Sequence, residues 1–371
     1  MLSTLAALRR IVPLLGICLI PVHAGAVETL RIAMEEPGAA AEVSGKSLSL
    51  GPDDEEADFK PLDSPRARVR AVDGRLEING VAWEHDAVRF RLGGDDPDQA
   101  IRVGGFRIRG DLVIRLRSAR LQLINVLPLE EYLVGVVGAE MPPAFPLEAL
   151  KAQAVAARTY ALRKKLDAAD SSTHLGTGVL HQVYRGLSRH DERVRQAVEA
   201  TRGEILTFNL EPIEAYFHAS CGGRTESGQA ALGRDLPYLQ PVACPCEKLA
   251  SNKWELLVSG TDLKALFGIA EGSSMGIAAR SGTGRVRTLS LGSNRFLDAV
   301  ELRQKLGYDR LKSLWFGLDR AAAGGIKLSG RGHGHGAGMC QFGARAFAAQ
   351  GRGYREILLH YYSGVEIQQL Y

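Results

Sequence analysis

The chain has 371 residues, which is more than one average domain needs and enough for two. Apolar residues make up 45% of the sequence and charged residues 24%, as in a globular protein, so disorder of the whole chain is not expected. The formal net charge is +4, and it becomes +2 when the two arginines of the leader described next are subtracted. So small a charge argues against a nucleic-acid partner, which would call for a basic stripe or patch.

The N-terminus has the three-part layout of a secretory signal peptide. Basic residues precede an apolar run at residues 11–20, and Ala24-Gly25-Ala26 forms a small-x-small cleavage pattern. The apolar run is about half of the ~20 residues that span a bilayer, and nothing later is long enough for a stable membrane span. A retained signal anchor is the main alternative. We expect residues 1–26 to be removed and the mature chain to be exported to the periplasm or cell envelope.

Residues 27–125 are predicted to form a β-rich N-terminal region. An acidic stretch near residues 51–65 contains two prolines and indicates a loop or linker. From residue 66 onward, short segments such as Val88-Arg89-Phe90-Arg91-Leu92 alternate apolar and polar residues between Gly or Asp-Gly turns. This pattern is typical of antiparallel β structure. Because no group of residues here indicates chemistry, we expect the region to support or dock a substrate.

Two helices are predicted after Pro128. Residues 129–139 and 146–166 each follow a proline suited to a helix start and carry glutamate in the first turn. The first helix is stopped by Pro142-Pro143. Short elements are expected after that at residues 194–201, 204–208, 214–217 and 262–266. Together with the N-terminal strands they predict the α+β class, a β-rich part followed by a mixed domain.

Glu140 is the first residue with a candidate chemical role. At the C-terminal end of a helix the dipole disfavours a carboxylate, which favours the protonated carboxyl that a general acid needs. Lys151 and Arg158 are seven residues apart on the next helix, so they share one face and could bring positive charge to a site. Spacing alone fits a solvated glutamate and a solvated basic stripe at least as well.

Residues 329–344 form the most unusual segment of the sequence. Glycines alternate with Arg331, His333 and His335, so in an extended chain the glycines would face one side and these polar residues the other. Glycine permits the close approach of a ligand or another backbone, and we interpret the segment as functional. It matches neither a dinucleotide fingerprint nor a P-loop, and no organic cofactor is expected.

The cysteines offer two alternatives. His218, Cys221, Cys244 and Cys246 form a His/Cys₃ set that could close a tetrahedral structural zinc site. In an oxidising compartment, a disulfide from Cys221 to Cys244 or Cys246 is the competing arrangement, and both remain open. Cys340 lies apart from this set in the glycine-rich segment.

A series of ordered motifs runs from about residue 126 to the C-terminus. The motifs are Leu127-Pro128-Leu129-Glu130-Glu131-Tyr132, Ala139-Glu140-Met141-Pro142, the helix segment from Glu148 to Tyr160, Gln182-Val183-Tyr184-Arg185-Gly186, Ala215 to Gly223, Gly332 to Ala344, and His360-Tyr361-Tyr362. Together they resemble the stage II sporulation protein D/LytB family. The resemblance divides the chain into a signal peptide (1–26), the β-rich region (27–125) and a domain of this family (126–371).

The resemblance implies a lytic transglycosylase that acts on peptidoglycan glycan strands. Such an enzyme cleaves the bond between N-acetylmuramic acid and N-acetylglucosamine and leaves a 1,6-anhydro end. The catalytic acid of the family maps onto Glu140. The expected catalytic residues are Glu140, Lys151, Arg158 and His335, and the expected substrate-binding residues are Tyr184, Arg331, His333 and Gln341.

One carboxyl is enough for this chemistry, because the sugar's own 6-hydroxyl attacks and no second carboxylate is needed as nucleophile or base. Two places depart from the family pattern. Residues 174–181 lack the Asp/Thr-rich version, and Cys340 stands where many relatives have serine. Because some relatives are described as amidase enhancers, the alternative function is a non-catalytic glycan-binding module that stimulates a partner cell-wall amidase.

Overall fold

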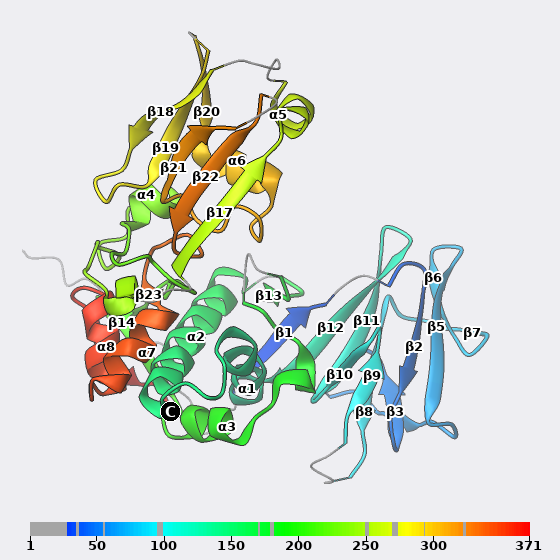
Figure 1. Ribbon diagram of the computed structural model, residues 1–371. Coiled ribbons are helices and arrows are strands. Elements are labelled where there is room, and N and C mark those ends of the chain that lie inside the picture. Colours follow the sequence, from blue (N-terminus) through cyan, green and yellow to red (C-terminus); the bar gives the residue numbers. More distant parts are fainter. Residues whose placement is uncertain are drawn as a thin grey trace, which may run out of the picture.

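The computed structural model describes residues 28–34, 37–54, 56–94, 99–169, 171–178, 182–248, 252–268, 274–292, 294–321 and 324–371. The predicted leader lies outside the described residues. Figure 1 shows three groups of elements, namely an N-terminal region of strands, a helical region that contains the C-terminus, and a third region around β17–β22. Helices and strands both contribute largely, which confirms the α+β class and the β-rich N-terminal part.

Two sheets form the N-terminal region. The strand orders are β13-β1-β12-β11-β8-β3-β4 and β10-β9-β2-β5-β6-β7. The strands are β1 (Thr29–Ala33), β2 (Ala40–Ser44), β3 (Leu48–Gly51), β4 (Lys60–Pro61), β5 (Arg66–Val72), β6 (Arg75–Ile78), β7 (Val81–Ala82), β8 (Ala87–Leu92), β9 (Ile101–Val103), β10 (Phe106–Ile108), β11 (Asp111–Arg117), β12 (Arg120–Pro128) and β13 (Leu175–Gly176). One apolar core joins the two sheets, with Val43 and Val69 from one and Phe90 and Ile114 from the other.

The stretch expected as a linker is fastened to these sheets. Its residues 60–61 form β4, which pairs with β3. Asp53 forms ion pairs with Arg31 of β1 at 2.6 Å and with Arg115 of β11 at 3.4 Å. The boundary expected between residues 125 and 126 falls inside β12, whose last residue Pro128 leads directly into the first helix. The N-terminal sheets therefore continue into the helical region through a strand and a proline rather than through a loose connection.

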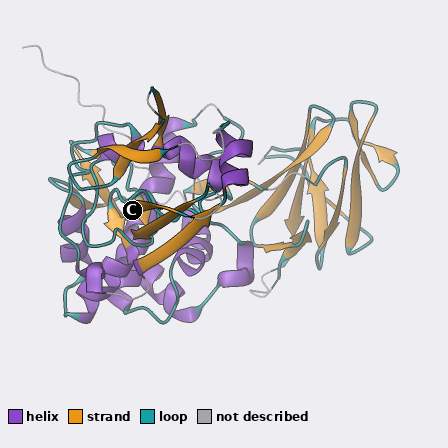
Figure 2. Ribbon diagram, turned by 45° about the horizontal axis from the view of Figure 1, so that its top comes forward, coloured by secondary structure: helices purple, strands orange, loops and turns teal. Residues whose placement is uncertain are grey.

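The helical region is built around two helices that the sequence predicts to within one residue at each end. Its elements are α1 (Leu129–Glu140), α2 (Leu147–Asp167), η1 (Gly186–Arg189), α3 (Glu192–Glu199), β14 (Glu204–Phe208), β15 (Glu211–Pro212), β16 (Phe217–His218), α4 (Gly228–Leu232), η2 (Pro245–Lys248), β23 (Met339–Cys340), α7 (Gln341–Ala349), α8 (Tyr354–Tyr361) and β24 (Glu366–Gln369). The alanines of α2 are buried, so α2 lies at the centre of this core and packs against α1, α3, α7 and α8. Figure 2 shows the helices gathered at one side and the N-terminal strands at the other.

The third region is inserted between η2 and β23 and was not anticipated from the sequence beyond one short element near residue 262. It contains β17 (Lys253–Val258), α5 (Gly260–Phe267), β18 (Met275–Arg280), β19 (Val286–Leu291), β20 (Arg295–Asp298), α6 (Ala299–Leu306), β21 (Phe316–Arg320) and β22 (Ile326–Arg331). Two three-stranded sheets, β17-β22-β21 and β18-β19-β20, enclose a separate apolar core. Across the described residues, no helix is long and apolar enough to cross a membrane.

Candidate functional site

Glu140 is the last residue of α1 and its side chain is partly buried. The backbone N–H of Val183 donates to Oε1 at 2.9 Å, and the side-chain amide of Gln341 donates to Oε2 at 3.2 Å. Burial raises the pKa of the carboxyl above its ordinary value, although both hydrogen bonds act in the opposite direction. The net direction favours the protonated form, which can donate a proton.

Three separate segments hold this carboxyl in place. Gln341 begins α7, and its amide also reaches Oε1 of Gln153 on α2 at 3.4 Å. The segment that carries Val183 is fixed by Gln182, which accepts a hydrogen bond from Tyr132 at 3.0 Å. Sequence reasoning missed Gln153, which the structure buries fully; the signal in the sequence was a glutamine among the alanines of the predicted helix.

Lys151 lies on α2, and its recorded contacts do not include Glu140. Its ammonium group pairs with Glu148 at 2.7 Å and lies 5.6 Å from the ring centroid of Tyr354. Because the side chain is about one-fifth exposed, the ammonium group is open to solvent on one side. Among the described residues, no cation forms an ion pair with Glu140.

Arg158 has a structural position rather than the expected place beside Glu140. Its guanidinium is fully buried and makes a bidentate pair with Glu130, in which both N···O distances are 2.7 Å. The remaining contacts go to the backbone carbonyls of Glu204 and Val198. A residue with no exposed surface and with its donors used inside the protein cannot contact a substrate in this arrangement.

Tyr184, which was expected to bind substrate, is also placed in the core. Only 3% of the residue is exposed, and its hydroxyl donates to Asn125 of β12 at 2.7 Å. Its ring packs against Tyr132, and the two ring centroids are 5.2 Å apart. Tyr184 therefore joins the helical region to the N-terminal sheets instead of facing a ligand.

The glycine-rich segment is not extended, contrary to the expectation from its alternation. Gly332, Gly334, Gly336 and Gly338 all have positive φ, between 70° and 114°, so the chain turns repeatedly after β22 ends. A Cβ at Gly338 would collide with the carbonyl of Tyr216, which explains why this position needs glycine. The polar residues of the segment are consequently not presented on one common face.

The two histidines of this segment have different surroundings. His333 is exposed, whereas both ring nitrogens of His335 are occupied. The ring N–H at Nε2 donates to the Phe217 carbonyl at 2.9 Å, and Nδ1 accepts from the Ala337 N–H at 3.2 Å. Burial lowers the pKa of His335 to about 4, so the ring is neutral near pH 7. His335 thus supports the fold of the loop around it.

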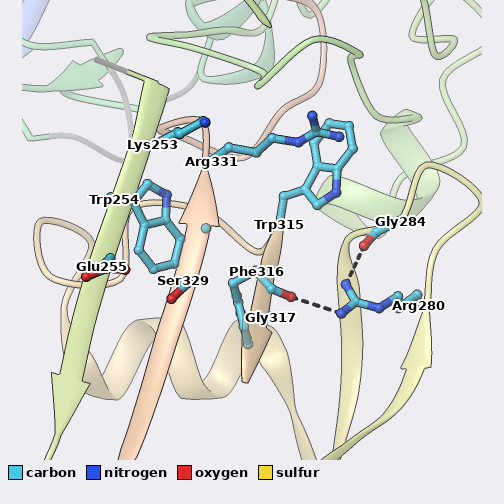
Figure 3. Close-up of a pocket in the computed structure, with 11 residues that line it drawn as sticks. Lys253, Trp254, Glu255, Arg280, Gly284, Trp315, Phe316, Gly317, Ser329 and Arg331 are labelled. Carbon is cyan, nitrogen blue, oxygen red and sulfur yellow. Dashed lines mark hydrogen bonds between the residues drawn. The ribbon is translucent and has the colours of Figure 1, made fainter. Parts of the chain in front are cut away.

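Arg331 lines a groove on the third region, shown in Figure 3. The groove has a volume of about 870 Å³ and also includes Lys253, Trp254, Arg280 and Trp315. The guanidinium carbon of Arg331 lies 3.7 Å from the ring centroid of Trp315, and the same side chain pairs with Glu247 at 3.1 Å. Figure 3 shows Arg331, the last residue of β22, beside Trp315, which directly precedes β21.

Four buried cysteines form a candidate metal centre. The Sγ atoms of Cys221, Cys244, Cys246 and Cys340 all lie within 4.8 Å of one another. Cys340 thus takes the place that the sequence analysis gave to His218, because β16 and β23 pair side by side and bring Cys340 in from the far end of the chain. His218 lies outside the group, with Nδ1 3.0 Å from the Ala337 carbonyl oxygen.

The cluster has the surroundings of a thiolate site. The backbone N–H groups of Cys221 and Gly343 both donate to Sγ of Cys340, at 3.3 Å and 3.2 Å. Burial raises the pKa of the Cys221 and Cys340 thiols, while hydrogen bonds from the neighbouring cysteines lower the pKa of Cys246. Four such groups cannot all ionise unless a cation compensates their charge, so this donor set fits a metal ion.

Comparisons with known proteins agree with the motifs. Residues 117–208, which include Glu140, match the family model described as stage II sporulation protein. Stage II sporulation protein D of Bacillus amyloliquefaciens is 34% identical over 267 residues, which cover 66% of this chain and 76% of that protein. An uncharacterized protein of Brachyspira hyodysenteriae is 34% identical over 307 residues, covering 81% of this chain and 82% of that protein.

A third similar protein has a different name. The amidase enhancer of Bacillus subtilis is 29% identical over 291 residues, and the match covers 63% of this chain but only 40% of that protein. The family is connected with cell-wall processes, and the part of the chain that matches its model includes Glu140 and Val183. From the motifs, the family model and the extent of the relatives, the chain belongs to the stage II sporulation protein D family.

Proposed function

We propose that this protein is a peptidoglycan lytic transglycosylase with Glu140 as its general acid and base. The observation that carries the proposal is the partly buried carboxyl with a raised pKa, held by neutral amide donors from Val183 and Gln341. A carboxyl whose pKa is raised holds its proton to a higher pH than an exposed one, which suits it to protonate a leaving oxygen.

The proposed reaction uses one carboxyl twice. Glu140 donates its proton to the glycosidic oxygen between N-acetylmuramic acid and N-acetylglucosamine as the bond from the anomeric carbon to that oxygen breaks. The 6-hydroxyl of the muramic acid residue then bonds to the anomeric carbon, and its proton passes to the Glu140 carboxylate. The products are a 1,6-anhydro end and a free hydroxyl on the leaving sugar, and the carboxyl regains its starting form.

The two amide donors have a clear place in this cycle. While Glu140 is transiently ionised, the Val183 N–H and the Gln341 side chain stabilise the carboxylate without adding a formal charge. A nearby ammonium or guanidinium group would lower the pKa of the carboxyl and hold it ionised, so that it would carry no proton to donate. Of the catalytic set expected from the resemblance, we therefore assign the proton transfer to Glu140, and we assign its positioning to Gln341, which the resemblance implied as a substrate-binding residue.

The groove of the third region is proposed as a second contact for the glycan strand. Trp315 offers an aromatic ring, while Lys253, Arg280 and Arg331 offer charged donors beside it. Aromatic rings and planar guanidinium groups suit a substrate that carries sugar rings and carboxylates. Arg331 remains a proposed substrate-binding residue on this ground, and exposed His333 remains a proposed contact in the adjoining loop.

The test of the proposed reaction is mass analysis of products from purified glycan strands, with and without stem peptides. The expected product carries a 1,6-anhydro end and forms only with active protein. A reducing end in its place would indicate a hydrolase. If no strand cleavage occurs but a partner cell-wall amidase is accelerated, the alternative function replaces the one proposed. The similarity to a protein named amidase enhancer is the observation that favours this alternative.

We further propose that the four-cysteine cluster holds one structural Zn²⁺. In a tetrahedral zinc–thiolate site with Zn–S bonds of about 2.3 Å, neighbouring sulfurs are about 3.8 Å apart. In the structure the four Sγ atoms lie within 4.8 Å of one another, and those of Cys221 and Cys246 are 3.4 Å apart. These distances are close to the sulfur–sulfur separation of such a zinc site. A disulfide would need about 2.05 Å, and all four cysteines are free thiols.

We also propose that the protein works outside the cytoplasm. The support is the order of basic, apolar and small residues at 1–26 together with relatives connected with sporulation and the cell wall. Its substrate would be met in the periplasm or cell envelope.

A further inference from the structure

The outer face of the six-stranded sheet carries a concentration of arginines, here called the arginine face. It consists of the outward-facing charged residues and one serine of β2, β5, β6, β9 and β10, namely Glu42, Ser44, Arg66, Arg68, Arg70, Arg75, Glu77, Arg102 and Arg107. Six arginines and two glutamates give this face a charge of +4 (6 − 2), which equals the formal net charge of the whole chain. The alternate residues of the same strands are buried in the core between the two sheets.

The strand register lines up three of these arginines in one row. Arg107 of β10 is directly opposite Arg102 of β9, and Arg102 is opposite Ser44 of β2. Ser44 is in turn opposite Arg66 of β5. Neighbouring strands are about 4.8 Å apart, so the row spans four strands with two arginines in adjacent places. Like charges directly opposite each other destabilise a sheet, and folding alone gives no reason for this arrangement.

The fold compensates only part of these charges, because the strand register puts Glu42 opposite Arg68 and Glu77 opposite Arg70. Arg70 forms an ion pair with Glu77 at 3.4 Å. Within the described part of the chain, no ion pair involves Arg66, Arg68, Arg102 or Arg107. Their side chains are exposed, so their guanidinium groups are free to meet anions from outside the molecule. The cost of like-charge contact is offset once such an anion binds.

We propose that the arginine face docks on the surface of an anionic lipid bilayer. Arg66, Arg68 and Arg70 follow β5 at alternate positions, about 7 Å apart, and the row through Arg102 and Arg107 runs across the strands. The positive charges of the arginine face therefore extend in two directions across the sheet. This arrangement matches the planar array of phosphates on a bilayer better than one linear polymer. Guanidinium groups bind phosphate oxygens through two donors at once.

The attachment is electrostatic in character. The outward positions of these strands hold mainly polar residues and alanines, such as Ala40 and Ala82, and the apolar exceptions on this sheet are two valines, Val72 and Val81, with no exposed leucine or aromatic side chain. Each arginine near an anionic membrane surface contributes a similar increment of binding, and salt weakens the sum. The proposal does not depend on the reaction assigned to Glu140, because it concerns a different face and a different ligand.

The experiment is vesicle co-sedimentation with the full chain in its exported form. Vesicles of phosphatidylcholine alone are compared with vesicles that also contain phosphatidylglycerol, at low and high salt. We expect binding to the anionic vesicles that is lost at high salt. The triple variant Arg66→Thr/Arg102→Thr/Arg107→Thr should lower the partition coefficient by about 100-fold. Its melting temperature should equal or exceed that of the wild type, because threonine suits strands and like-charge contacts disappear.

A matched control removes the same charge elsewhere. Arg117, Arg287 and Arg320 are exposed strand arginines outside the arginine face, and the triple change of these residues to threonine should leave binding close to that of the wild type. Equal binding to both kinds of vesicle overturns the proposal. Equal losses in the two triple variants also overturn it, because only net charge would then matter. If the wild type does not bind anionic vesicles, and its binding to isolated peptidoglycan is weakened in the arginine-face variant but not in the control, the face contacts the wall instead.

Discussion

Around Glu140 the hydrogen-bond donors are neutral amides, although a resemblance to the family suggests cations. The nearest basic candidates on α2 are engaged elsewhere, Lys151 with Glu148 and Arg158 with Glu130. The difference matters chemically, because a cation beside a carboxyl lowers its pKa and keeps it ionised, whereas partial burial raises the pKa of Glu140 despite the two amide hydrogen bonds. The surroundings of Glu140 therefore favour the protonated carboxyl, which can act as a proton donor.

Replacing Glu140 with glutamine is expected to abolish strand cleavage while preserving the fold. The amide keeps the shape of the side chain but cannot deliver a proton of the needed acidity. Loss of general acid catalysis alone lowers a rate by about 10²–10⁴. The measurement is formation of 1,6-anhydro ends from glycan strands. Glu192→Gln at the exposed start of α3 is the control and should retain activity. Activity of Glu140→Gln within a few-fold of the wild type would assign the proton transfer to another residue.

The raised pKa of Glu140 also predicts a pH-dependent stability. The folded chain binds the proton more tightly than the unfolded chain, so this contribution is complete below the ordinary carboxyl pKa and is lost as the pH rises through the folded pKa. Glu140→Gln cannot lose a proton there. Relative to the wild type, its urea midpoint should therefore increase as the pH is raised towards neutrality. Parallel curves for the two proteins would show that the carboxyl pKa is not raised.

Arg158 is expected to matter for stability rather than for chemistry. Burial opposes ionisation of Glu130, but its hydrogen bonds and its attraction to Arg158 prevail and lower its pKa. Arg158→Met leaves that buried carboxylate without its partner, which costs about 3–5 kcal/mol in the free energy of unfolding. Adding Glu130→Gln should recover part of the loss, as measured by urea denaturation. An Arg158→Met protein of normal stability but without activity would instead support a catalytic contact.

At the scale of elements, the four-cysteine cluster ties together parts of the chain that are far apart. Cys340 ends β23 and caps α7, Cys246 lies in η2, and Cys221 follows β16. Gly343 fits beneath them only because it lacks a side chain, since a Cβ there would collide with Cys244 and Tyr361. A metal at this point would hold the start of α7, and with it Gln341, against the strands.

Two single substitutions distinguish the zinc ligands expected from the sequence from the four clustered cysteines proposed from the structure. Cys340→Ser should lose the metal and lower the melting temperature, because metal binding is coupled to folding. His218→Gln should retain about one zinc per chain, because four cysteines complete the tetrahedral shell without it. Elemental analysis of both purified proteins is the measurement. Loss of zinc from His218→Gln but not from Cys340→Ser would restore the His/Cys₃ set.

What could be predicted from the sequence depended on whether the signal was local. The alternation in β5 and the prolines before α1 and α2 are local, and those elements are where the pattern indicates. The meeting of Cys340 with Cys221 and of Gln153 with Gln341 depends on chain segments packed across the whole domain. Arg158 looked like a surface cation because seven-residue spacing defines a helix face but does not show which neighbour covers it.

For the whole molecule, the leader predicts where the protein is found. The exported form should begin at Val27, because cleavage is expected after Ala24-Gly25-Ala26. N-terminal sequencing of the protein recovered from the cell envelope is the measurement. An intact Met1 on a cytoplasmic pool would contradict export, and an intact Met1 in the membrane fraction would indicate a retained anchor.

The contact between Glu140 and Gln341 joins residues that are 201 positions apart. A chain that is made from its N-terminus, and that folds as it emerges, presents α1 long before α7 exists. Until α7 has been made, the carboxyl of Glu140 lacks the hydrogen bond from the Gln341 amide and is less enclosed by the protein. Because the chain is made in this order, the site around the proposed catalytic carboxyl stays incomplete during synthesis. It becomes complete when the contact between Glu140 and Gln341 forms.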